Sequence, residues 1–210
     1  MPLWYTGPMD YTKAFYNQYA EVFEKKTQGL ARMPWLKLFM RALPKHGRVL
    51  DLGCAYGRDA ELLTRKGFAV TGVDFSGAMI RKARRRVPKA TFIVQDVQRL
   101  PLRKNTFDGV WASAVLLHVS KKAVPRILHK LYAVLRPGGL LFIGTYLGKG
   151  EGLVMDKRYQ GARKYYSYFS VSEIKKRLVD AGFSLIHFVS RPPDAYEKRR
   201  VVELVAKKTV

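Results

Sequence analysis

The stretch VLDLGCAYGRDAELL, residues 49–63, decides the fold of this 210-residue chain. Together with Arg48, its first residues predict a buried strand over 48–52, and Gly53 opens the loop that follows. From about Asp59 onward the apolar residues have helical spacing. A sharp turn from strand to helix usually leaves backbone N–H groups free, so we expect this loop to hold a ligand.

Strands and helices alternate after this loop. We predict strands at 48–52, 69–73, 91–94, 109–112 and 140–146, and helices near 59–66, 77–87 and up to about 135. Helices between strands imply parallel crossovers. The last two strands, 183–190 and 201–206, have a short link and are expected to be antiparallel. The predicted fold class is α/β: a Rossmann-like, doubly wound, seven-stranded sheet that is mostly parallel with an antiparallel C-terminal strand.

Three segments lie outside this alternation. Apolar and aromatic residues at near-helical spacing predict one helix over 11–26, and a second is expected over 34–43. Residues 147–168 are polar and aromatic without periodicity, so no regular element is predicted there. Ser170 and Glu173 form a capping-box pattern that predicts the start of another helix.

The composition is strongly basic, with 39 Lys and Arg against 16 Asp and Glu and a formal net charge of +23. Such an imbalance favours polyanion binding, although a basic proteome would also produce it. Cys54 is the single cysteine, which excludes an internal disulfide and a cysteine-built metal site. The sequence has no uninterrupted apolar run of 18 residues and no apolar core near its start, so we predict a cytoplasmic protein without a membrane span.

Acids at three successive strand ends indicate the class of ligand. Asp51, Asp74 and Asp96 lie at the ends of the first three predicted strands, which share one edge of the sheet. The glycine spacing around Gly53 fits neither the dinucleotide fingerprint nor the phosphate-binding loop of nucleotide hydrolases. An acidic pocket suits an uncharged or cationic nucleoside better than a pyrophosphate.

Five segments resemble, in order, the motifs of class I S-adenosylmethionine-dependent methyltransferases. VLDLGCAYG is similar to the first motif, VTGVDFSGAMI to the second and VQDVQRLPL to the adenine-binding motif. FDGVWASAVLLHV and LRPGGLLFIGTY are similar to the motifs of the fourth and fifth strands. The resemblance extends from about Tyr16 to the C-terminus, and one departure is Ala55, which stands where the family usually has a glycine.

The resemblance implies S-adenosyl-L-methionine as the cofactor and no metal. In it, Asp74 would accept the ribose hydroxyls, Asp96 the adenine amino group, and Phe75 and Met79 would flank the adenine. The expected cofactor-binding residues are Asp51, Gly53, Cys54, Ala55, Arg58, Asp74, Phe75, Met79, Asp96, Val97 and Ser113.

For catalysis the resemblance implies His118 and Tyr16. His118 follows the fourth predicted strand, where an imidazole beside the reactive methyl group would be suited to proton removal. Tyr16 would lie on an N-terminal helix of the kind that the family uses as a lid. We therefore expect a helical lid over residues 1–44 and a cofactor-binding methyltransferase domain over residues 45–210.

The methyl acceptor is left open between two classes. The motifs look most like the small-molecule branch related to ubiquinone-pathway methyltransferases. The alternative is RNA, because residues 113–120 and 163–183 distantly resemble tRNA wobble-uridine methyltransferases and basic clusters occur at 81–86, 175–178 and 197–200. Interleaved aromatic residues would then stack on bases: Tyr165, Tyr166, Tyr168 and Phe169. A third reading is a cofactor-binding scaffold without turnover.

Overall fold

A computed structural model describes residues 8–29, 33–193 and 199–209. Its centre is a seven-stranded sheet with the order β3-β2-β1-β4-β5-β9-β8. β9 is antiparallel to both of its neighbours, and the other pairs are parallel. This arrangement confirms the predicted fold class. The strands are β1 (Arg48–Leu52), β2 (Ala69–Asp74), β3 (Thr91–Val94), β4 (Phe107–Ser113), β5 (Leu135–Tyr146), β8 (Phe183–Arg191) and β9 (Val201–Lys208).

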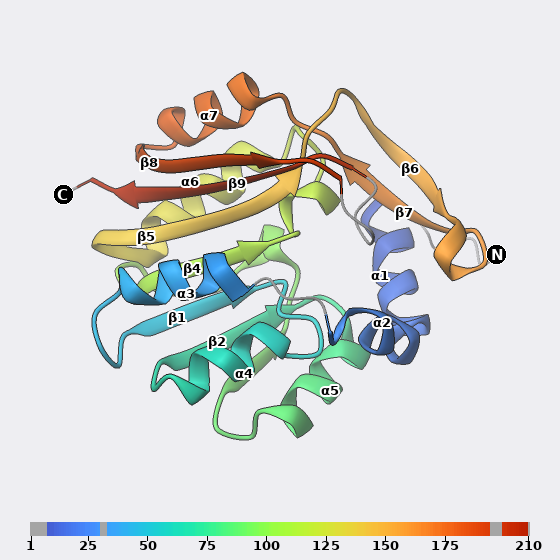
Figure 1. Ribbon diagram of the computed structural model, residues 1–210, viewed down its shortest axis with the longest axis horizontal. Coiled ribbons are helices and arrows are strands. Elements are labelled where there is room, and N and C mark those ends of the chain that lie inside the picture. Colours follow the sequence, from blue (N-terminus) through green and yellow to red (C-terminus); the bar gives the residue numbers. More distant parts are fainter. Residues whose placement is uncertain (1–7, 30–32, 194–198, 210) are drawn as a thin grey trace.

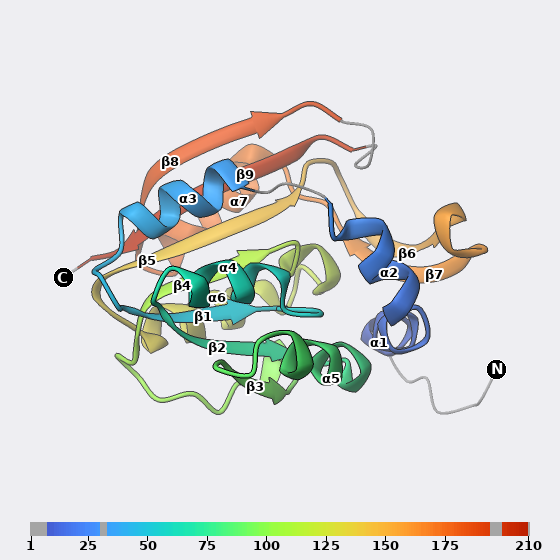
Figure 2. The same cartoon turned by 60° about the horizontal axis from the view of Figure 1, so that its bottom comes forward.

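Helices cover both faces of the sheet (Figure 2). On one face, the apolar sides of three helices join the core around Trp111, whose ring stacks on Phe142 at 3.8 Å. On the other face, two helices bury leucines and isoleucines against β4 and β5. The first group is α3 (Met33–Arg41), α4 (Arg58–Arg65) and α5 (Gly77–Arg86), and the second is α6 (Val124–Val134) and α7 (Val171–Asp180). Ser170 caps α7 as predicted, since its hydroxyl accepts from the Glu173 N–H.

The prediction of a single helix over 11–26 is wrong. The chain forms α1 (Pro8–Gln18) and α2 (Ala20–Thr27), which break at Tyr19, where φ is −103° and ψ is 20°. The two helices run in different directions because each packs on a different surface (Figure 1). α1 lies against β7 and α5, whereas α2 is joined to α5 by ion pairs and to the start of α4 by the bond from Arg58 to the Thr27 carbonyl. α3, in contrast, belongs to the helical layer on the sheet.

The absence of regular structure predicted for 147–168 is also wrong. β6 (Glu151–Asp156) and β7 (Ala162–Ser167) form an antiparallel hairpin, joined through the short helix η3 (Lys157–Tyr159). The other short helices are η1 (Val97–Arg99) and η2 (Leu116–His118). β7 shows no polar alternation because α1 covers it on one side and η2 contacts it as well. Among the described helices, none is long and apolar enough to cross a bilayer.

Candidate active site

A cavity of about 140 Å³ lies at the carboxyl ends of β1 and β4, where the strand order reverses. In doubly wound sheets this is the position at which ligands bind. The cavity is lined by the carboxyl ends of β1, β2, β4 and β5 and by the segments that follow β1, β2, β3 and β4. The helices α1 and α2 and the β6–β7 hairpin complete the lining. Of the residues expected from the sequence, those that line the cavity are Tyr16, Asp51, Gly53, Cys54, Ala55, Arg58, Asp74, Phe75, Val97, Ser113 and His118.

Two of the expected residues lie elsewhere. Met79 is fully buried in a small cluster with Ala20 and Tyr56 and does not line the cavity. Asp96 also lies outside the lining, and its carboxylate caps η1 by accepting from the Gln98 N–H at 2.8 Å. The contacts of Asp96 are therefore those of a turn-forming residue in this state of the protein.

We expected free backbone N–H groups in the loop after β1, but three of them already have acceptors within the protein. The N–H groups of Gly53 and Cys54 both donate to the Val73 carbonyl, at 2.7 and 3.1 Å, and the Ala55 N–H donates to Asp74. A ligand would therefore make van der Waals contact with this loop and would not bond to these three N–H groups. Ala55 has a left-handed φ of 47°, a conformation that costs an alanine about 1 kcal/mol. Its bond to Asp74 offsets that cost.

Gly53 provides the cradle of the site. Its φ is +68°, and a Cβ placed on it would lie 2.5 Å from a methyl group of Val115 in the loop after β4. The two loops therefore approach each other as closely as a glycine allows. Any ligand that crosses this edge of the sheet rests on bare backbone.

The carboxylate of Asp74 is almost completely buried, with 6% of the residue exposed. It accepts from the Ser76 N–H at 2.8 Å and from the Ala55 N–H at 3.0 Å. Burial raises its pKa to about 6, although these backbone bonds act in the opposite direction. The Phe75 N–H is a third donor, so one lone-pair position of the carboxylate remains for a ligand hydroxyl.

Asp51 carries a buried oxygen without a hydrogen-bond partner. Among the described residues that line the cavity, no other carboxylate has such an oxygen. Oδ2 of Asp51 has no hydrogen-bond partner, and 2% of the residue is exposed. Burial and the neighbouring charge of Asp59 raise its pKa well above the usual value. A buried, unsatisfied acceptor of this kind costs stability, so a cationic or N–H-bearing ligand group would satisfy it.

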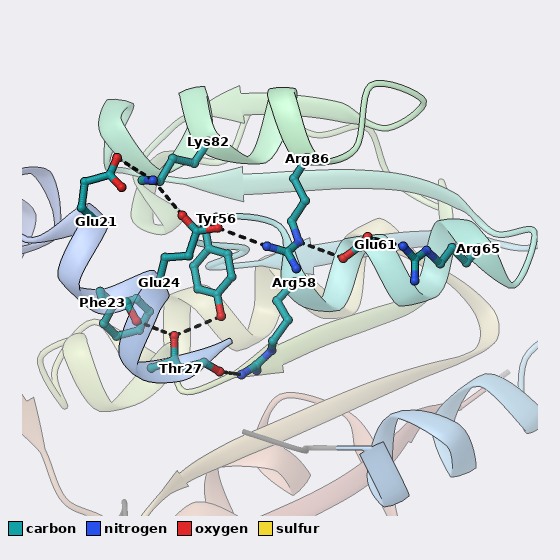
Figure 3. Close-up of polar contacts among 10 residues, drawn as sticks. All are labelled: Glu21, Phe23, Glu24, Thr27, Tyr56, Arg58, Glu61, Arg65, Lys82 and Arg86. Atoms are coloured by element: carbon teal, nitrogen blue, oxygen red, sulfur yellow. Dashed lines mark hydrogen bonds and ion pairs between the residues drawn. The ribbon is translucent and has the colours of Figure 1, made fainter. Parts of the chain in front are cut away.

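Arg58 connects the loop after β1 to the end of α2. Its Nε donates to Asp59 at 2.8 Å, and its Nη1 donates to the Thr27 carbonyl at the end of α2 at 3.1 Å. The Thr27 hydroxyl and the Tyr56 hydroxyl are in turn 3.0 Å apart (Figure 3). The C-terminal end of α2 is thereby fixed to the loop that forms the floor of the cavity.

A row of alternating charges, here called the charge ladder, holds α2 on α5 and continues from α5 to α4 (Figure 3). Successive partners are 2.6 to 3.1 Å apart. The inner members are mostly shielded from solvent, whereas the two ends are about 70% exposed, at 72% and 71%. In order, the charge ladder consists of Glu21, Lys82, Glu24, Arg86, Glu61 and Arg65.

His118 and Tyr16 meet in the structure. The Tyr16 hydroxyl lies 2.9 Å from Nε2 of His118, and Nδ1 of the same ring lies 2.8 Å from the Tyr165 carbonyl. A carbonyl only accepts, so Nδ1 carries the proton. Burial, together with the nearby charge of Lys164, lowers the pKa of His118 to about 3. The neutral ring therefore accepts from Tyr16 through Nε2.

The hairpin supplies two cations that the sequence analysis did not single out, Arg158 and Lys164. Both pair with Asp156, at 2.8 and 2.9 Å. The side chain of Lys164 is 3% exposed, and its ammonium lies 4.2 Å from the centre of the Phe15 ring. The available signal was Gly161 between two short runs of strand-forming residues, which is a hairpin pattern.

Negative and positive side chains line different parts of the cavity. Its acidic lining residues come from the sheet side, and the hairpin contributes the cations Arg158 and Lys164. The acidic side, with its glycine cradle, suits a cationic nucleoside. The acids of that side are Asp51, Asp59 and Asp74.

The chain is similar in sequence to known methyltransferases. Residues 49–139 match the family described as "Methyltransferase domain". Trans-aconitate 2-methyltransferase of Variovorax paradoxus is 34% identical over 138 residues, 64% of this chain and 49% of that protein. Malonyl-[acyl-carrier protein] O-methyltransferase of Enterobacter lignolyticus is 30% identical over 131 residues, 62% of this chain and 48% of that protein. The chain thus spans about half the length of these curated relatives.

A solved structure supports the same fold. The 1,6-didemethyltoxoflavin-N1-methyltransferase of Burkholderia thailandensis, with bound 1,6-didemethyltoxoflavin and S-adenosylhomocysteine, has a TM-score of 0.77 to this chain. The match covers 100% of this chain and 93% of that one at 24% identity. At this identity, the likeness establishes the fold.

Proposed function

The chain carries a class I S-adenosylmethionine-dependent methyltransferase domain, and from this premise we propose that it transfers a methyl group to a small-molecule acceptor. The observation that carries the proposal is the buried Asp51 carboxylate, whose Oδ2 is unpaired, beside the Gly53 cradle. Both features fit S-adenosylmethionine, the cofactor of such domains, which bears an ammonium and a sulfonium and needs a close approach to backbone.

We assign the cofactor residues as follows. Asp51 holds the ammonium of the amino acid end, and Arg58 lies beside it for the carboxylate. Asp74 accepts a ribose hydroxyl at its remaining lone-pair position. Phe75 and Val97, which both line the cavity, flank the adenine. When bound, the cofactor supplies an electrophilic methyl group on sulfur.

The remaining residues orient the acceptor and exclude water, which suffices when the methyl donor is already reactive. α1 closes the cavity, and Tyr16 presents its hydroxyl to it from the lid. Both ring nitrogens of His118 are engaged, and its low pKa makes it a weak base. We therefore assign to His118 the positioning of Tyr16 rather than the proton removal suggested by the sequence.

The distribution of basic residues also favours a small acceptor over RNA. The cluster on α5 and the cluster on α7 lie at opposite ends of the molecule (Figure 1). Within the first, Lys82 and Arg86 belong to the charge ladder, and in the second, Arg177 pairs with Glu173. Of the residues described, the aromatic side chains considered for base stacking are largely covered: Tyr165, Tyr166 and Phe169 are buried.

The proposal is tested by two measurements on the full chain. Calorimetry with S-adenosylhomocysteine should give a single site. Incubation with methyl-labelled cofactor and either a small-metabolite extract or total tRNA should label a component of the extract. Binding without any transfer would leave the scaffold alternative, and transfer only to tRNA would replace the small acceptor by RNA.

Replacing Asp51 by asparagine should separate stability from binding. Asp51→Asn replaces a carboxyl group whose charged form is disfavoured by burial and by Asp59, so the thermal midpoint of the free protein should stay the same or rise. Loss of the charged acceptor should cost about 1.5–3 kcal/mol of cofactor affinity, which is about a 10- to 100-fold rise in Kd. Thermal unfolding and calorimetry with S-adenosylhomocysteine measure the two effects.

Asp108 is the matched control for Asp51. It is also buried, but it lies outside the cavity lining, accepts from the Arg48 N–H at 2.7 Å and pairs with Arg136. Asp108→Asn should therefore lower the midpoint and leave cofactor affinity unchanged. If both variants bind S-adenosylhomocysteine as well as the wild type does, Asp51 does not hold the cofactor.

A further inference from the structure

Asn17 of α1 is bonded to the turn between β2 and α5. Its side-chain oxygen Oδ1 accepts from the Ala78 N–H at 3.2 Å and lies 2.8 Å from the Ser76 hydroxyl. A backbone N–H only donates, so the amide atom that faces Ala78 is the oxygen, and the Ser76 hydroxyl is the donor in the second bond. One side chain of α1 thus accepts two hydrogen bonds at the N-terminal end of α5.

Ser76 links this contact to Asp74. The residue is fully buried, and its hydroxyl also accepts from the Met79 N–H at 3.2 Å as the N-cap of α5. Its own N–H donates to Oδ1 of Asp74 at 2.8 Å. A buried hydroxyl needs an acceptor for its proton, and Asn17 provides that acceptor. The bond from α1 therefore helps to fix Ser76 in the position that keeps its N–H on the carboxylate.

The orientation of the Asp74 carboxylate depends on this turn. The N–H groups of Phe75 and Ser76, the next two residues of the chain, both bond to the carboxylate. An aspartate that bonds to the backbone just after it is oriented by the turn that it forms. Since one lone-pair position remains for a ligand, a displacement of Ser76 moves the place at which a ribose hydroxyl binds.

The residue before Asn17 contacts the other side of the cavity. The Tyr16 hydroxyl meets His118 in the segment after β4, whereas Asn17 meets Ser76 after β2. Neighbouring residues of a helix do not share a face, so the two side chains reach different elements. α1 is thereby attached on both sides of the site, and Asn17 contributes a polar contact on the β2 side.

From these contacts, and resting on the proposed function, we propose that Asn17 is a positioning residue for the cofactor. It orients the Asp74 carboxylate toward a ribose hydroxyl by holding Ser76. Asn17 acts without touching the cofactor, since it lies outside the cavity lining. Because its bonds exist only while α1 lies on α5, cofactor binding and the docking of α1 favour each other.

The affinities of the full chain for two ligands test the proposal. Calorimetry compares S-adenosylhomocysteine with its analogue that lacks both ribose hydroxyls, for the wild type and for Asn17→Ala. The substitution should raise the Kd for S-adenosylhomocysteine about 3- to 10-fold, as expected for the loss of one or two neutral hydrogen bonds. The Kd for the analogue should stay the same, because the analogue lacks the group that Asp74 holds.

Two further variants of α1 complete the comparison. Asn17→Asp keeps an oxygen acceptor, and its charge suits the N-terminal end of α5, so it should retain the wild-type Kd. Gln18→Ala truncates the next side chain of the helix, which is exposed, and should change neither Kd. Alanine favours a helix more than asparagine or glutamine does, so a loss of affinity in Asn17→Ala does not arise from a lower helix propensity of α1.

Three results would overturn the proposal: wild-type affinity of Asn17→Ala, an equal rise of both Kd values, or no recovery in Asn17→Asp. An equal rise would mean that the substitution disturbs the whole site and not the ribose contact. Failure of the proposed function looks different, because the wild type would then not bind S-adenosylhomocysteine. A wild type that binds both ligands equally would show that Asp74 does not hold the ribose, which overturns the proposal and leaves the methyltransferase function intact.

Discussion

Replacing Gly53 by alanine is expected to remove measurable cofactor binding and to lower the free energy of unfolding by about 2–5 kcal/mol. The left-handed φ of +68° alone costs an alanine about 1–2 kcal/mol. The new methyl group would in addition lie 2.5 Å from a methyl group of Val115, a buried residue that lines the cavity. Relief of that overlap shifts Val115 into the cavity or separates the loops after β1 and β4, and either change disturbs the proposed cofactor site.

Gly152 provides the control for Gly53. It lies on β6, its φ is not in the left-handed region, and nothing lies within 4 Å of the position that its Cβ would occupy. Gly152→Ala should therefore unfold and bind S-adenosylhomocysteine like the wild type. Chemical denaturation and calorimetry on both variants measure the effects. Normal cofactor binding by Gly53→Ala would show that the cradle is not part of the site.

Removal of the lid is expected to have the largest effect on turnover. A chain without residues 1–28 loses Tyr16, the cover that α1 gives the cavity, and the two glutamates of the charge ladder, Glu21 and Glu24. Cofactor binding should weaken, and methyl transfer should fall by about 100-fold or more, because acceptor alignment and water exclusion depend on the lid. The comparison uses the acceptor found with labelled extract, and circular dichroism checks that the remaining sheet is folded.

A variant of the full chain tests the lid without a deletion. The double substitution Lys82→Gln and Arg86→Gln removes the inner cations of the charge ladder and should release α2, reproducing part of the loss of turnover. Arg65→Gln removes an exposed outer cation, 71% accessible, and should change little. Wild-type turnover in the truncated chain would instead make α1 and α2 a structural appendage.

The sheet and the acidic side of the cavity were predictable because their signals are local. The alternation of strands and helices along the chain is enough to recognise the turn at Gly53 and the acids at strand ends. Asp51, Asp74 and Gly53 accordingly line the cavity as expected. Met79, expected beside the adenine, lies with Ala20 and Tyr56 outside the cavity lining, because a sequence pattern does not tell whether a buried helix residue faces a cavity or another helix.

The acceptor side was not predictable to the same degree, because it depends on contacts between distant segments. β7 is covered by α1 and contacted by η2, so its burial erases the alternation that marks most strands. Lys164 is a charged residue that owes its burial to Asp156 and to rings from α1 and η3. The break at Tyr19 likewise arises because α1 and α2 pack on different surfaces.

The contact between α1 and the β6–β7 hairpin bears on how the sequence can change during evolution. The Tyr165 N–H donates to Thr12 of α1, and the Tyr165 carbonyl accepts from His118. Both groups belong to the main chain, which every residue except proline provides in full. The neighbouring side chains that face the acceptor can therefore be exchanged during evolution while these two bonds persist. In a hairpin of this kind, the side chains that line the cavity can vary among descendants while α1 and His118 keep their attachment to the same backbone groups.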